Sequence, residues 1–481
     1  MESIRIELQP LPDIVKEVVA VLGLNGINVS KDEFAPNHII CTEATPDTKA
    51  TRYDRLVALL QRVNKCRVPL KSLLSSMAEG KSTDISAMPF LVILRMLGVS
   101  KTVVPLHSNR DLIKESINGS MWMGESRDRR TLDLSRIAAY DGPQVSLYFR
   151  FIHKYITWLL LPALLALVSI FVTPIEAKHW AMISVLWGTV AVVRTWRSLV
   201  ATIPEQNESR MHLFAYHGIM SNVTYYMRYS LSYSGFAIFL TTVVLILFAS
   251  IKVTIPMLDD GLSETTMHTI ARIIMGLAFE PVARLLTCLE HHIEDSSYET
   301  SRYTKVLILR IVSFYAYPIS LAFTSHNPLL DTERFLSGTF TLSLAISTIT
   351  EMLPWLYAKF VTRKRGPLAW EGQDWDVNDE YLEMATQYAN LMAFGFVFPR
   401  SFLIAFINNI AEGYLDAQKL YMSKRCFPAL TNVAGMWSRV FQAISIIGVM
   451  VNIVILARVG SVGEALTIFL VFIGMKATFI I

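Results

Sequence analysis

The chain has 481 residues, of which 52% are hydrophobic and only 17% are charged, and its formal net charge is +4. Soluble domains carry about 25% charged residues, so this composition indicates a membrane protein. The small net charge, without basic runs interleaved with aromatic residues, gives no support for a nucleic-acid partner, and none is expected.

The first 140 residues differ from the rest, because they contain no apolar run long enough to cross a bilayer. Their hydrophobic patterns predict alternating strands and amphipathic helices. The predicted strands are residues 3–8, 38–44 and 102–106, and the predicted helices are residues 12–24, 53–63 and 110–117. The start of the chain lacks the basic residues and apolar core of a signal peptide. We therefore expect residues 1–140 to form a small cytosolic α/β domain.

Residues 141–481 contain a series of apolar runs that predict an all-α, polytopic membrane domain of about ten transmembrane helices. The predicted spans are residues 156–172, 180–200, 235–251, 270–289, 306–323, 335–360, 381–398, 401–420, 440–457 and 465–481. Basic residues gather in alternate connecting loops, which predicts a multi-pass topology with both termini in the cytosol. The sequence does not distinguish the plasma membrane from the endoplasmic reticulum.

The seventh and eighth predicted spans are joined by a tight turn at Pro399, so their outer ends return to the same side of the membrane. Glu380 and Glu383 lie three residues apart at one outer end, on one helical face. Glu412 and Asp416 lie four residues apart at the other. A charged group inside a membrane helix costs roughly 2.5–3.5 kcal/mol, and clustered acids repel one another, so we expect a cation between them. Oxygen ligands without His or Cys favour calcium over zinc.

A fifth acid, Glu351, lies on the sixth predicted span about two turns before a basic run at Lys359 and residues 363–365. That run predicts the cytosolic side, which places Glu351 at a depth similar to the other acids. Asn408 lies one turn before Glu412 on the same face and is expected to add an oxygen ligand. The alternative is that all these acids are ordinary interfacial charges at helix ends.

Two runs in this hairpin, EYLEM (380–384) and NNIAEGYLDAQK (408–419), resemble the signature of the anoctamin family. Residues 141–163 and 289–323 are also similar to passages of that family. The resemblance implies a homodimer of ten-helix subunits with a ferredoxin-like cytosolic domain. It also implies about two calcium ions per subunit, and either phospholipid scrambling or anion conduction activated by calcium.

The sixth predicted span carries a polar stripe, because Thr339, Ser343, Ser347 and Glu351 recur at every fourth position. Hydroxyl groups on one face suit a water-filled groove, but they also satisfy their own backbone or pack against another helix. The pattern alone leaves both interpretations open. The resemblance favours the groove, because anoctamins line their permeation path with the third to seventh helices. Ser347 stands where many anoctamins have an asparagine ligand, which predicts a reduced calcium affinity.

The fourth and fifth predicted spans contain charged residues, which we include among the candidate groove residues: Glu280, Arg284, Lys305 and Arg310. Glu280 and Arg284 are four residues apart and are expected to pair. The alternative for this set is an internal salt bridge with arginines that reach toward the membrane surface.

No nucleophile, P-loop, dinucleotide or zinc-protease motif is present, so the chain is not expected to be an enzyme. We predict a calcium-activated phospholipid scramblase in which the sixth helix, bent at Pro354, moves when calcium draws Glu351 toward the other acids. A calcium-activated chloride channel is the alternative, since Arg284, Lys305 and Arg310 are suited to attract anions. A non-transporting membrane tether is the third possibility, and the presence of all five acids argues against it.

Overall fold

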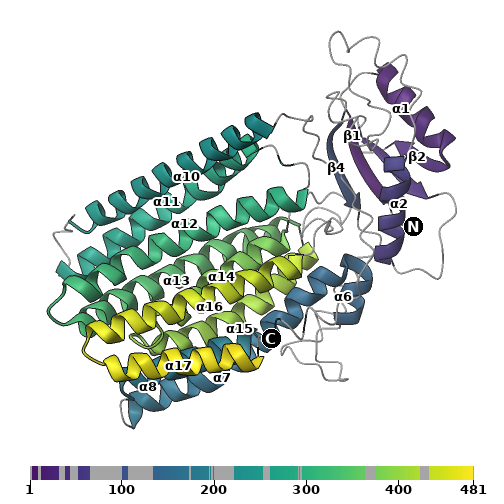
Figure 1. The fold of residues 1–481 in the computed structure, drawn as a ribbon. Helices are drawn as coiled ribbons and strands as arrows, with labels where there is room; N and C mark the ends of the chain where they lie inside the picture. The colour runs from purple at the N-terminus through teal and green to yellow at the C-terminus, as the bar shows by residue number, and fades with distance from the viewer. Residues whose placement is uncertain are drawn as a thin grey trace.

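The computed structural model of the chain describes residues 3–8, 12–31, 38–43, 52–65, 100–106, 134–172, 175–193, 196, 199, 222–252, 260–290, 292, 295–362, 375–422 and 433–479. The described residues between 3 and 106 form an α/β unit, which Figure 1 shows at one end of a bundle of long helices. Its elements follow in the order β1 (Ser3–Leu8), α1 (Pro12–Leu24), β2 (Ile27–Lys31), β3 (His38–Glu43), α2 (Arg52–Lys65) and β4 (Ser100–Leu106).

The four described strands form one antiparallel sheet in the order β2-β3-β1-β4. The β-α-β-β-α-β element order is that of a ferredoxin-like fold. Ile6 of β1 is opposite Ile39 of β3, and both are buried with Val18 of α1 and Leu59 of α2. The apolar faces of the sheet and of the two helices therefore share one core.

The predictions for this unit are confirmed for three strands and two helices, within one or two residues at each end. Strand β2 was not predicted, although Ile27 and Val29 alternate with polar residues. Gly26, with a φ of +74°, makes the tight connection from α1 to β2, a conformation that a glycine adopts readily. The predicted helix at residues 110–117 lies outside the described residues.

The bundle begins after a short helix, α6 (Leu134–Asp141), which packs against α2. Its long elements are α7 (Pro143–Phe171), α8 (Ala177–Leu186) with the π-helical η2 (Trp187–Val193), α10 (Asn222–Ser250), α11 (Asp260–Glu290), α12 (Asp295–Thr324), α13 (Pro328–Thr362), α14 (Val377–Phe394), α15 (Arg400–Met422), α16 (Val433–Arg458) and α17 (Val462–Phe479). Each predicted span overlaps one of these elements. The second overlaps α8 and η2, and most of its residues beyond 193 lie outside the described residues.

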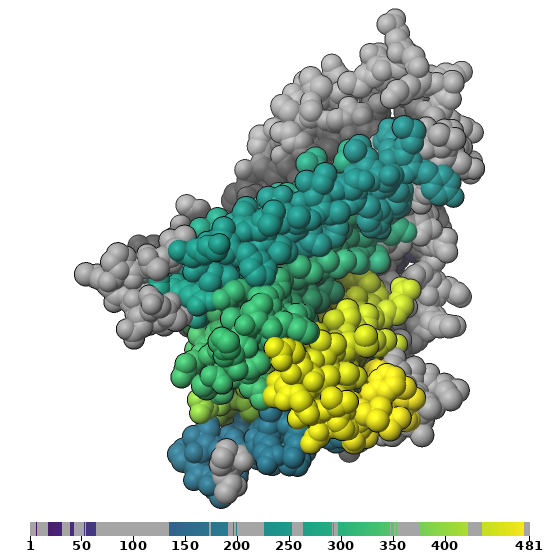
Figure 2. All heavy atoms as spheres, turned by 60° about the vertical axis from the view of Figure 1, so that its left-hand side comes forward, coloured from purple at the N-terminus to yellow at the C-terminus, as the bar shows by residue number. Residues whose placement is uncertain are grey.

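Within the described residues, four helical stretches are long and apolar enough to cross a membrane, namely Pro143–Phe171, Tyr226–Ser250, Ser297–Thr324 and Gly435–Arg458. The outer surface of the bundle is apolar as well. Leu161 of α7 is 67% exposed, Ile238 of α10 is 69% exposed, and Leu470 of α17 is 59% exposed. Figure 2 shows α10 (teal) and α17 (yellow) on opposite sides of the green helices between them. Such a surface suits contact with lipid, and the number of spans stays a prediction.

A cluster of aromatic rings connects α7, α14 and α16 at the centre of the bundle. Trp196 lies 5.2 Å from Tyr381 of α14, 4.6 Å from Phe151 of α7 and 5.4 Å from Phe441 of α16, measured between ring centroids. All four side chains are 1% exposed or less. Aromatic pairs at these separations contribute stability beyond that of hydrophobic burial, so they hold α14 rigidly in place.

The connection between α14 and α15 is longer than predicted, because α14 ends at Phe394 rather than at Phe398 and α15 begins at Arg400. The Gly395 amide still donates to the Leu391 carbonyl, at 2.9 Å, and the Phe398 amide donates to the Phe394 carbonyl, also at 2.9 Å. A methyl group on Gly395 would lie 2.4 Å from the Leu391 oxygen and 2.7 Å from the ring of Phe402. The turn is therefore compact enough to require glycine.

We expect Gly395→Ala to lower the free energy of unfolding by about 1–3 kcal/mol, because the added methyl overpacks the turn. Thermal unfolding of the purified protein in detergent would measure the change. Gly276→Ala is the matched control, because nothing lies within 4 Å of the methyl that it adds to α11. Equal midpoints for both variants would contradict the close packing at this turn.

Candidate functional site

A buried group of charges joins α14 to α15 at the ends of these helices that are remote from the Gly395 turn. The Lys419 ammonium lies 2.9 Å from Asp416 Oδ1 and 3.6 Å from Glu380 Oε1. Asp416 is fully buried, and Glu380 is 8% exposed. The structure thus brings one acid from each helix to a shared positive charge.

Helix α7 contributes a further contact to this group. The Tyr148 hydroxyl, which is fully buried, donates to Asp416 Oδ2 at 2.5 Å. The charges of Glu380 and Glu412 also act on this hydroxyl, and Glu412 is 6% exposed. Three buried acids therefore lie around one tyrosine. Neither Tyr148 nor Lys419 was identified from the sequence. The three-residue spacing of Asp416 and Lys419 was a usable signal, whereas nothing in the sequence pointed to Tyr148.

Helix α13 contacts the same region through a threonine. Thr348 Oγ1 donates to Asn408 Oδ1 of α15 at 2.9 Å. Thr348 precedes Glu351 by one helical turn, so this contact holds the Glu351 segment of α13 beside α15. The side chains of Glu351, Ser347 and Pro354 lie outside the described residues. Glu383 is half-buried on α14, where its charge acts on Asp416.

The donor chemistry of this group fits a hard divalent cation, because the buried candidate ligands on α14 and α15 are all oxygen atoms. The Lys419 ammonium shows that a positive charge is accommodated between two of the acids. Among the described residues, no group of three or more His, Cys, Asp or Glu side chains is arranged to hold a metal ion. Both oxygens of Asp416 are already hydrogen-bonded, one to Lys419 and one to Tyr148. A metal ion that used Asp416 would therefore share these oxygens with Lys419 and Tyr148 or replace one of them.

The polar stripe on α13 packs against α11 over part of its length. Arg272 of α11 donates to the Ser343 hydroxyl and lies 5.2 Å from the ring centroid of Phe314. Thr339 is 1% exposed. A methyl group on Gly338 would lie 2.5 Å from Thr265 Cγ2 of α11, so the two backbones approach closely. The stripe therefore combines helix packing with a contact to a half-buried arginine, and the sequence did not indicate Arg272.

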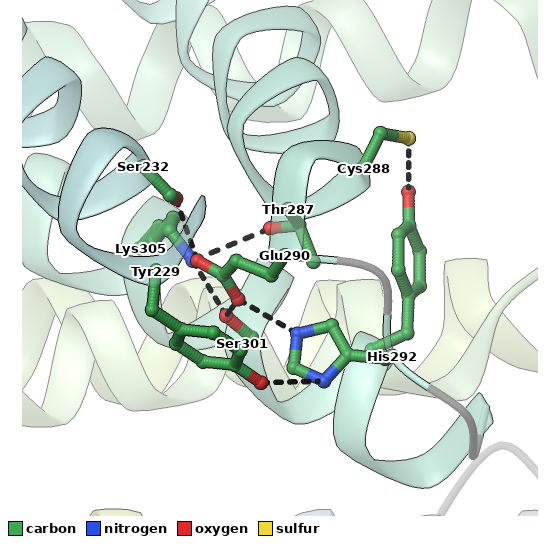
Figure 3. A network of polar contacts seen from close by, with 9 residues as sticks. Tyr229, Ser232, Thr287, Cys288, Glu290, His292, Ser301 and Lys305 are labelled. Atoms are coloured by element: carbon green, nitrogen blue, oxygen red, sulfur yellow. Dashed lines mark hydrogen bonds and ion pairs between the residues drawn. The ribbon is translucent and has the colours of Figure 1, made fainter. Parts of the chain in front are cut away.

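Lys305 lies inside a buried polar network between α10, α11 and α12, which Figure 3 shows. Glu290 Oε1 accepts hydrogen bonds from Ser232 and from the Lys305 ammonium, both at 2.6 Å. Glu290 Oε2 accepts one from the Ser301 hydroxyl and lies 2.7 Å from His292 Nε2. The side chain of Lys305 is 3% exposed and that of Glu290 is fully buried. Lys305 is thus neutralised within the helix layer, a setting that the sequence did not reveal.

The predicted pair between Glu280 and Arg284 is confirmed, with 2.7 Å between Arg284 Nε and Glu280 Oε1. Arg302 also approaches this acid, at 3.4 Å from Glu280 Oε1. Arg310 is half-buried on α12, close enough to Arg272 for the two positive charges to interact. Of the basic residues proposed for the groove, Arg284 and Lys305 therefore each have an acidic partner.

A family model described as "Anoctamin: Calcium-activated chloride channel" matches residues 137–481. The chain belongs to the anoctamin family. Anoctamin-10 of Mus musculus and of Homo sapiens are each 24% identical to it over 412 residues, covering 74% of this chain and 62% of the relative. Anoctamin-3 of Homo sapiens is 27% identical over 227 residues, covering 38% of this chain and 23% of that relative.

This anoctamin thus spans 62% of the length of the anoctamin-10 relatives that it matches. Family membership, together with the apolar helices of the bundle, identifies it as an integral, multi-pass membrane protein. The matched residues include all the candidate acids and the whole described bundle from Ile137 onward.

Replacing Lys305 of this anoctamin by Met should lower the free energy of unfolding by about 3–5 kcal/mol, because Glu290 would keep a buried charge without its ammonium partner. Thermal unfolding in detergent would measure the loss. Arg284→Met is the control, because this side chain is 59% exposed and its ion pair contributes at most about 1 kcal/mol. A Lys305 variant as stable as the control, but with altered ion selectivity, would place Lys305 in a permeation path instead.

Proposed function

We propose that this anoctamin is a calcium-activated phospholipid scramblase. The observation that carries the proposal is the group of buried oxygen ligands on α14 and α15, in which Asp416 and Glu380 share one positive charge. Buried acids are retained in membrane helices chiefly where they have a functional partner. Family membership supports calcium-activated transport in general.

The proposed ligands come from three helices: Glu380 and Glu383 of α14, Asn408, Glu412 and Asp416 of α15, and Glu351 of α13. About two bound calcium ions would supply the positive charge that cancels the repulsion among these acids. The α14 and α15 ligands lie on helices that are fixed by the aromatic core and by packing against α7. Helix α13, which we propose to bend at Pro354, is then the element that moves when Glu351 approaches the others.

Two observations favour lipid over chloride as the main transported species. Arg284 is paired with Glu280, and Lys305 is paired with Glu290. An anion path needs positive charges that are not cancelled by neighbouring acids, and these two residues do not provide them. Charged pairs and hydroxyl groups suit zwitterionic headgroups, which carry both signs. The printed description of the family model, a calcium-activated chloride channel, supports chloride conduction as the alternative function.

The contact between α11 and α13 is consistent with a closed path. Arg272 is bonded to Ser343, and Gly338 lies directly against Thr265. Headgroups could pass between these helices only after both contacts part. We propose Thr339, Ser343 and Ser347, with Glu280, Arg284 and Arg310 on the neighbouring helices, as groove residues in the open state. Lys305 is left out of this set, because it is enclosed with Glu290. Family membership also supports the proposal of a homodimer with both termini of each subunit in the cytosol.

Reconstitution into liposomes tests the proposal directly. Lipid movement would be followed by chemical quenching of headgroup-labelled lipids, and chloride movement by a flux assay on the same vesicles. The proposal requires calcium-dependent quenching beyond the outer leaflet. Chloride flux without lipid movement would favour the channel, and neither activity at any calcium concentration would favour the tether.

Glu351→Gln and Glu412→Gln should change the calcium response in different ways. Glu412 belongs to the fixed part of the site, so its loss should displace the curve to at least tenfold higher calcium. Glu351 is the only proposed acid on α13. Without it, the affinities of the closed and open states for calcium differ less, so calcium shifts the equilibrium between them less. We expect more lipid movement without calcium and a smaller gain on adding it.

Transport measured against free calcium separates these cases. Glu176→Gln is the matched control, because this acid is 64% exposed, pairs with Lys178, and is neither a proposed ligand nor a proposed groove residue. If Glu351→Gln only moves the midpoint and leaves the basal rate and the gain intact, α13 is not the gate.

A further inference from the structure

Lys419 occupies a position that a metal ion in the proposed site would also favour. Its ammonium lies within hydrogen-bond distance of Asp416, at 2.9 Å, and within ion-pair distance of Glu380, at 3.6 Å. The two acids come from different helices, so the lysine performs the joining role that a bridging cation would perform. With two acids and one ammonium, the trio keeps one negative charge.

The position of Lys419 at the edge of the site allows its side chain to move away from Asp416 and Glu380. Lys419 lies in the last turn of α15, and its side chain is 21% exposed, whereas that of Asp416 is fully buried. A lysine is a compact, strongly hydrated charge on a flexible four-carbon stem, so it can turn toward water without moving the helix. Lys305, in contrast, is 3% exposed and makes hydrogen bonds to Glu290, Thr287 and Ser301, which leaves its ammonium enclosed.

We propose that Lys419 is a built-in competitor for the divalent cation. Its ammonium stabilises Asp416 and Glu380 when no metal is bound, and it must leave the space between them before a metal ion bonds both acids. The inference rests on the proposed calcium site and adds the residue that sets its affinity. The apparent affinity is reduced by the fraction of molecules in which Lys419 still occupies the space.

Calcium binding to the purified full chain tests this role without any transport measurement. Isothermal titration calorimetry would compare the unchanged protein with Lys419→Met and Lys419→Gln, which remove the charge, and with Lys419→Arg, which keeps it. We expect both neutral variants to bind calcium about tenfold more tightly, or ~1.4 kcal/mol, and the arginine variant to bind like the unchanged protein. Lys419→Gln retains an N–H donor toward Asp416, so it serves where Lys419→Met does not fold.

Thermal unfolding provides a second measurement on the same samples. Without calcium, the neutral variants should unfold at lower temperature, because Asp416 and Glu380 lose their counter-charge. Saturating calcium should raise their midpoints more than it raises that of the unchanged protein. Adding Asp416→Asn to Lys419→Gln should abolish the tight binding, which ties it to this position.

The outcomes separate the inference from the proposed function. If the unchanged protein binds calcium and the neutral variants bind it equally or less tightly, Lys419 is only a structural partner of the acids and the inference fails alone. If neither the unchanged protein nor the neutral variants bind calcium, the calcium site and the inference fail together. Binding that is seen only in the neutral variants supports the inference in its strongest form.

Discussion

A carboxylate that is buried among apolar helices requires a positive charge or several hydrogen-bond donors beside it, because water is not there to solvate it. Two places in the described part of the bundle show how this requirement is satisfied. Glu290 is surrounded by donors from α10 and α12, and Asp416 is held by Tyr148 of α7 and Lys419 of its own helix. These contacts determine how the ends of the helices are set against one another.

The two places differ in how easily their partners can be exchanged. Around Glu290, Lys305 is enclosed and further donors compensate the charge. These contacts therefore hold three helices together in a fixed arrangement. Around Asp416 the lysine is partly exposed and is shared with a second acid on α14. A buried ion pair resists the loss of one partner, but it allows replacement of that partner by another cation. Only the second arrangement is therefore suited to sensing an ion.

The sequence predicted what depends on spacing along one helix and missed what depends on contact between helices. The i,i+4 pair of Glu280 and Arg284 is present as expected, and the predicted spans coincide with helices. The Tyr148–Asp416 contact joins residues 268 positions apart, and the Arg272–Ser343 contact joins two helices. Such contacts depend on the rotation and crossing of helices, which hydrophobic periodicity does not specify. Whether the acids of different helices come close enough to share a metal ion depends on the same helix rotation and crossing, so their metal-binding role stays a prediction.

Helix α13 differs from its neighbours in how it is held. Helix α14 is fastened by the buried aromatic cluster around Trp196, and α15 packs along α7. The first half of α13 packs into the core, where Phe335 lies 4.7 Å from Tyr317 between ring centroids. Beside the proposed site, two hydrogen bonds less than two turns apart attach it, from Arg272 of α11 to Ser343 and from Thr348 to α15. A net hydrogen bond between neutral groups contributes about 0.5–1.5 kcal/mol, and one from a charged group about 1.5–3 kcal/mol, so the Thr348 attachment is the one that can be exchanged at modest cost. A change of charge beside Asn408 would then act on the part of α13 that these hydrogen bonds hold, while the acids of α14 and α15 keep their places.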